Sequence, residues 1–130
     1  MLAFIKNVED LIYTNESIYR TLFVVNTQQE CEELQTLLNS RDYSSIIVND
    51  IDKSINYHNI DQRIVIIHID NFEEFINYLM KTNCFENSYN LIGFSYSISE
   101  SQINNLKEYY LFVTNNNISN TILFDKKYCE

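Results

Sequence analysis

A histidine and several acids are placed where a general base could form. His68 stands in the run RIVIIHID (63–70), two residues before Asp70, and Asp50 follows an earlier apolar run. A carboxylate that orients a histidine can make the ring a general base. The same pattern suits a half-buried histidine that bonds a neighbouring carbonyl. We favour this second interpretation, because the sequence places no serine or cysteine within reach of the ring.

The acids and cysteines raise the question of a metal site. Asp50 and Asp52 could bind Mg²⁺ together with Asp70, since carboxylates at neighbouring strand ends converge. Solvated turn acids give the same pattern, and we favour them. The three cysteines form no C-x-x-C pair and are not spaced with a histidine for zinc: Cys31, Cys84 and Cys129. We therefore expect reduced thiols in the cytoplasm or another reducing intracellular compartment, with no metal and no cofactor.

Four units of a strand followed by a helix must position these residues. Short, continuously apolar runs predict strands at Thr21–Val25, Ser45–Val48, Arg63–Ile69, Asn90–Phe94 and Thr121–Phe124. Strands in which apolar and polar residues do not alternate are typical of a parallel sheet buried on both faces. We expect an α/β fold in three α/β/α layers, with a mostly parallel sheet of about five strands. We expect residues 1–130 to form one domain, with a leading amphipathic helix over 1–20 and strand-helix repeats over 21–125.

Polar residues follow the predicted strands at their carboxyl ends, where sheets of this type hold their ligands. The candidates are Asn26, Thr27, Asp50, His68, Asp70, Ser95 and Lys126. Caps and turns require polar residues at the same places, and we favour that structural role. Whether the rim binds a ligand is left open.

The first strand-to-helix junction, TLFVVNTQQECEELQTLL (21–38), carries no glycine. Thr27 and Glu30 form the T-x-x-E of a capping box, whose side chains bond the free amides of the first helical turn. A phosphate would otherwise meet those amides. The junction therefore predicts a capped helix and is mild evidence against nucleotide chemistry. Asp70 with Glu73, and Ser99 with Gln102, predict similar caps at two later helices.

This junction resembles the strand-turn-helix of a RecA-like domain of superfamily-two helicases. RIVIIHID (63–70) resembles the strand that ends in their Asp-Glu box, and LIGFSYS (91–97) is similar to the run before their Ser-Ala-Thr motif. The resemblance implies a degenerate domain over about residues 20–125. A chain with one glycine has no G-x-x-x-x-G-K-[ST] loop, and Asn71 stands in place of the box glutamate.

The order of elements also resembles the receiver domains of two-component signalling. Ser95 matches their Ser/Thr and Lys126 their final lysine, while Asp70 lies two residues from the place of their phospho-acceptor. Asn26 and Thr27 replace their acidic Mg²⁺-binding pair. Both resemblances imply a nucleotide, phosphate or nucleic-acid role as the alternative function.

The chain is acidic, with 9 Lys+Arg against 18 Asp+Glu and a net charge of −9. Nucleic-acid binding needs cationic groups on the protein, so the charge makes such a partner unlikely. No apolar run approaches a membrane span, and the first residues, MLAFIKNVEDLIY, lack the apolar core of a signal peptide. Abundant Asn, Ile, Tyr and Phe with no Pro point to an AT-rich genome: that of a large DNA virus, of a phage or low-GC bacterium, or of an AT-rich protist.

These observations favour a non-catalytic module that binds protein, either another protein or its own copies. It would be a small subunit or accessory factor of a larger assembly, which could be viral. The chain has 10 Tyr and 8 Phe, and aromatic side chains are frequent anchors of protein interfaces. The candidate interface aromatics are Tyr13, Tyr19, Tyr109, Tyr110 and Phe112. We expect no enzyme activity; the alternative is a small enzyme that uses His68 with Asp70 or Asp50.

Overall fold

The computed structural model of the chain describes residue 6 and residues 21–48, 64–81, 91–95, 97–114 and 122–124. The strands in this part are β1 (Thr21–Val25), β2 (Ser45–Val48), β3 (Ile64–His68), β4 (Leu91–Phe94) and β5 (Ile122–Phe124). The α-helices are α2 (Gln28–Ser40), α3 (Phe72–Lys81) and α4 (Glu100–Thr114), and a short 3-10 helix, η2 (Ile69–Asn71), precedes α3.

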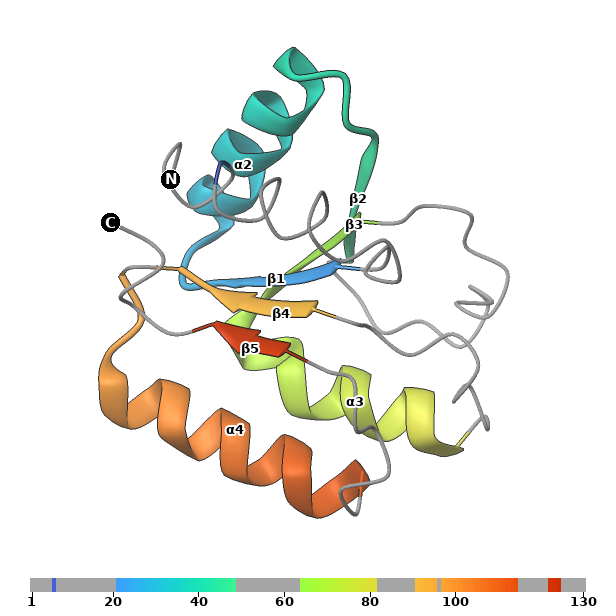
Figure 1. Cartoon of the computed structure of the whole chain (residues 1–130), viewed down its shortest axis with the longest axis vertical. Helices are drawn as coiled ribbons and strands as arrows, with labels where there is room; N and C mark the ends of the chain where they lie inside the picture. The colour runs from blue at the N-terminus through green and yellow to red at the C-terminus, as the bar shows by residue number, and fades with distance from the viewer. Residues whose placement is uncertain are drawn as a thin grey trace.

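The strands form one parallel sheet in the order β2-β3-β1-β4-β5 (Figure 1). The predicted α/β class with a parallel sheet is therefore confirmed. β1 and β2 begin and end at the predicted residues; β3 is one residue shorter than predicted at each end, and β4 and β5 each begin one residue later than predicted. Apart from residue 6, the leading helix predicted over 1–20 lies outside the described residues.

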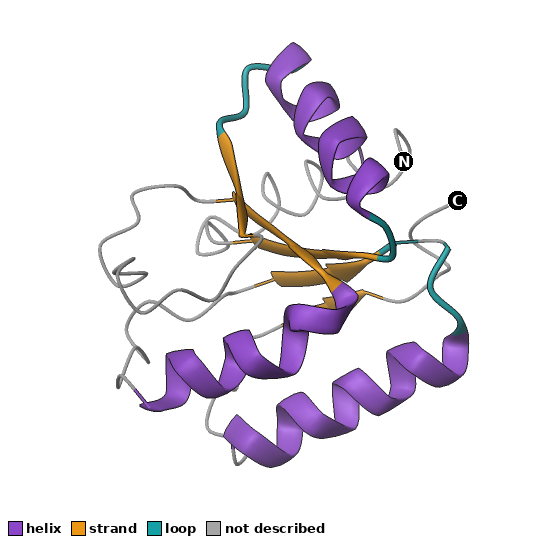
Figure 2. Cartoon of the chain, turned by 180° about the vertical axis from the view of Figure 1, so that it is seen from behind, coloured by secondary structure: helices purple, strands orange, loops and turns teal. Residues whose placement is uncertain are grey.

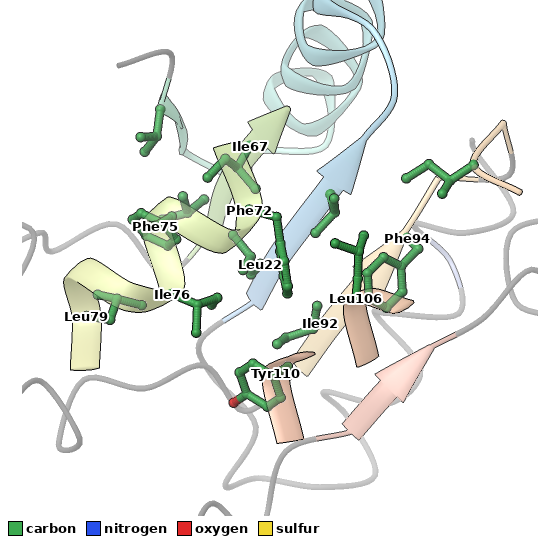
Figure 3. Packing of buried hydrophobic residues seen from close by; sticks show 14 of the residues in the cluster. Leu22, Ile67, Phe72, Phe75, Ile76, Leu79, Ile92, Phe94, Leu106 and Tyr110 are labelled. Atoms are coloured by element: carbon green, nitrogen blue, oxygen red, sulfur yellow. The ribbon is translucent and has the colours of Figure 1, made fainter. Parts of the chain in front are cut away.

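The two faces of the sheet are covered by different helices. α3 and α4 lie side by side on one face, and α2 lies on the other (Figures 1 and 2). The α3–α4 side holds the main hydrophobic cluster, in which Leu22 of β1 packs with residues such as Phe75 of α3 and Leu106 of α4 (Figure 3). Side chains of one strand alternate between faces. Phe23 therefore lies on the α2 side, where α2 buries Cys31, Leu34 and Leu38.

β1 is the central strand because its sequence can be buried on both faces. All five of its residues are buried, and it pairs with β3 on one side and β4 on the other. β2 is an edge strand and is only partly buried until Val48. From α2, Gln35 Nε2 donates a hydrogen bond of 3.2 Å to the Ser45 carbonyl at the start of this edge.

The helix ends show which predicted caps form. Ser99 and Gln102 make the full capping box: the Gln102 amide donates to Ser99 Oγ at 3.2 Å, and the Ser99 amide donates to Gln102 Oε1 at 3.1 Å. The cap predicted from Asp70 and Glu73 is wrong. His68 is the N-cap, since its Nδ1 accepts the Asp70 amide at 3.1 Å, and η2 then leads directly into α3. The predicted cap fails because Asp70 lies inside η2, so His68 precedes the helical segment and satisfies one of its first free amides.

Two backbone positions carry features that packing and turn geometry require. Asp42, just after α2, has a φ of 64°, the left-handed conformation that glycine adopts most easily. The only glycine of the chain, Gly93, lies inside β4 and is the pairing partner of Phe23 in β1. Since Gly93 has no Cβ, it leaves room beside the fully buried Phe23 ring.

Candidate functional site

The carboxyl ends of β1 and β4 are the place where this sheet would hold a ligand. These neighbouring strands lead to helices on opposite faces, since β1 continues into α2 and β4 into α4 (Figure 1). Their connections diverge, and ligands of open parallel sheets bind in the crevice that such divergence leaves. Asn26 and Thr27 follow β1, and Ser95 and Ser97 follow β4.

A glutamate carboxylate fills this place. Glu30, in the first turn of α2, is 9% exposed. Its Oε2 accepts a hydrogen bond from the Ser95 hydroxyl, and its Oε1 accepts the Ser97 hydroxyl at 2.8 Å and the Asn26 amide at 3.0 Å. We call these four residues the Glu30 network. Its donors are a backbone amide and two hydroxyls, the groups that would bind an anionic ligand in such a crevice.

Further hydrogen bonds fix the two loops around Glu30. The Ser95 amide donates to the Val24 carbonyl at 2.9 Å, which extends the pairing of β4 with β1 by one residue. Asn26 Nδ2 donates to the Ser97 carbonyl at 3.4 Å, and the Ser97 amide donates to Ser95 Oγ at 3.3 Å. The loops after β1 and β4 are therefore joined by side chains of the protein itself.

Thr27 caps α2 as predicted, but the second half of the capping box differs. Thr27 Oγ1 accepts the Glu30 amide at 3.1 Å. The Glu30 carboxylate accepts the amide of Asn26, one residue earlier than the reciprocal bond of a capping box requires. The carboxylate is thus drawn toward the end of β4. A negative charge at a helix N-terminus is favourable, so Glu30 takes the electrostatic position of a bound anion.

The chemistry open to the network is restricted by its burial. Ser95 is 1% exposed, which leaves its hydroxyl out of reach of a substrate. Ser97 is exposed, and its hydroxyl donates to Glu30 while lying 3.1 Å from Ser95 Oγ. The hydroxyls and the carboxylate satisfy one another, as buried polar groups generally do. The arrangement is that of a structural network.

His68 and Asp70 lie together at the end of β3, but not in the geometry of a general base. The nitrogen nearer the acid, Nδ1, lies 3.6 Å from Asp70 Oδ2 and accepts the Asp70 amide at 3.1 Å. An orienting carboxylate accepts a proton from the ring nitrogen that it faces. Here that nitrogen is itself an acceptor, so Asp70 does not orient the ring in this way. Asp70 is 84% exposed at its side chain.

The remaining rim residues, Asp50 and Lys126, lie outside the described residues, as does Asp52. Among the residues that the structure describes, no group of three His, Cys, Asp or Glu side chains could hold a metal ion. No helix within the described ranges is long and apolar enough to span a membrane.

Burial raises the pKa of the Cys31 thiol from 9.0 to about 11, with Glu30 and Glu32 adding to the effect.

The candidate interface aromatics differ in their surroundings. Phe112 is 84% exposed on α4, Tyr109 is half-buried, and Tyr110 is buried in the main hydrophobic cluster. Tyr13 and Tyr19 lie outside the described residues. Leu111, which is not among the predicted interface residues, is 44% exposed beside Phe112. The sequence does contain a signal for an exposed apolar side chain here. Residues 109–112 are four consecutive large apolar residues, and a helix cannot bury four consecutive side chains against one neighbour.

Comparisons of the chain with protein-family models, with curated proteins and with solved structures find no match.

Proposed function

We propose that this protein is a non-catalytic module that binds another protein through the outer surface of α4. The observation that carries the proposal is the exposure of Phe112 and Leu111. They are the large hydrophobic side chains that stay exposed within the described part of the chain. Exposed aromatic side chains that bury on association supply much of the binding energy of protein interfaces.

The Glu30 network supports the choice of protein binding over nucleotide binding. A nucleotide phosphate at the ends of β1 and β4 would meet the Glu30 carboxylate, and the donors that could bind it are already bonded to that carboxylate. The net charge of −9 also opposes nucleic acid. A degenerate helicase-like or receiver-like domain stays the alternative prediction. This alternative requires binding of ATP-Mg²⁺, a phosphate mimic or single-stranded nucleic acid at low salt. Titrations that detect no binding of any of the three would refute it.

The broader features of the proposal follow from the sequence. We infer a single three-layer α/β/α domain with a leading helix over 1–20, which serves as a small subunit or accessory factor of a larger assembly such as a viral one. The cysteine pattern is in keeping with a reducing intracellular compartment.

A photo-crosslinking experiment in the cell of origin tests the proposal. A photoreactive phenylalanine analogue is placed at position 112 and, as a matched control, at position 104, which is exposed two turns earlier on α4. We expect one protein to be crosslinked from position 112 in high yield and much less from position 104. The two purified proteins should then bind, and Phe112→Ser should weaken binding about 30-fold, the usual loss for an aromatic anchor. No specific crosslink from position 112 would overturn the proposal.

A further inference from the structure

We draw no further inference here: the strongest candidate, the exposed apolar patch of Leu111 and Phe112 at the end of α4, carries none, because the charged residues one turn before it, Lys107 and Glu108, have opposite signs and nothing in the described part of the structure shows what covers it.

Discussion

The Glu30 network makes a prediction about stability that follows from its burial. Glu30→Ala removes the acceptor of the Ser95 hydroxyl, and Ser95 is too buried to replace it with water. A buried polar group left without its partner costs about 1–3 kcal/mol. Loss of the negative charge at the N-terminus of α2 adds about 0.3–1 kcal/mol. The Ser97 hydroxyl and the Asn26 amide lie nearer solvent, so their lost hydrogen bonds add little to the cost. We therefore expect Glu30→Ala to lower the free energy of unfolding by about 3 kcal/mol.

Urea denaturation of three variants and a control measures this effect. Glu33→Ala is the control, because Glu33 is an exposed acid of the same helix that accepts a hydrogen bond from Gln29 at 3.0 Å. It should lose no more than about 0.5 kcal/mol. Ser95→Ala should lose about 1–2 kcal/mol. The double variant Glu30→Ala/Ser95→Ala should lose less free energy of unfolding than the two single variants lose together, by about 1 kcal/mol or more, because the two groups are hydrogen-bonded to each other.

Two results would refute the reasoning. If Glu30→Ala were as stable as Glu33→Ala, the carboxylate would not be an essential partner of the buried hydroxyl. If the losses of Glu30→Ala and Ser95→Ala were simply additive, the two residues would act independently. An unchanged dependence of the free energy of unfolding on urea concentration is needed for either comparison, because a changed slope indicates a different unfolded state.

Three further predictions concern other parts of the fold. Asp42→Gly should raise the free energy of unfolding by about 0.5–1 kcal/mol in thermal or urea denaturation, because glycine adopts the left-handed conformation without strain; a loss would show that the Asp42 side chain stabilises the turn. Gly93→Val should lower the free energy of unfolding by about 1–3 kcal/mol, because the new side chain crowds the buried Phe23 ring. An unchanged midpoint of urea denaturation would contradict that packing. The raised pKa of Cys31 favours the folded state while the thiol is protonated, so this contribution is present below pH 9.0 and is lost as the pH rises through about 11. The wild type should therefore lose more stability than Cys31→Ala between these pH values, and equal losses in the two proteins would argue against it.

The sequence predicts the strands well because each is a short apolar run with no competing pattern. β1 and β2 lie at their predicted residues, since both runs are bounded by polar residues. The first residue of a helix is harder to predict than a strand, because several polar residues near the start could each serve as the N-cap. Thr27 and Ser99 cap their helices as predicted, whereas Asp70 lies inside the 3-10 helix η2, which His68 caps.

The candidate site was only half visible in the sequence. The local part, Thr27 with Glu30, follows from a spacing of three residues. The contact of Glu30 with Ser95 joins residues 65 positions apart, and it depends on β4 lying next to β1, which sequence patterns do not fix. The exposure of Phe112 is similar, because the apolar stripe of α4 does not reveal which of four consecutive apolar side chains stays outside.

The Glu30 network has a consequence for how the sheet aligns its central strands. Ser95 follows β4 directly, and successive residues of a strand point to opposite faces. If β4 slipped by one residue along β1, the Ser95 hydroxyl would turn away and Glu30 would be left buried without its deepest donor. Apolar strands such as TLFVV and LIGF offer little other discrimination between neighbouring registers, because nearly any shift still buries hydrocarbon. The buried carboxylate therefore penalises a one-residue slip of β4 along β1 and so helps to fix the native register.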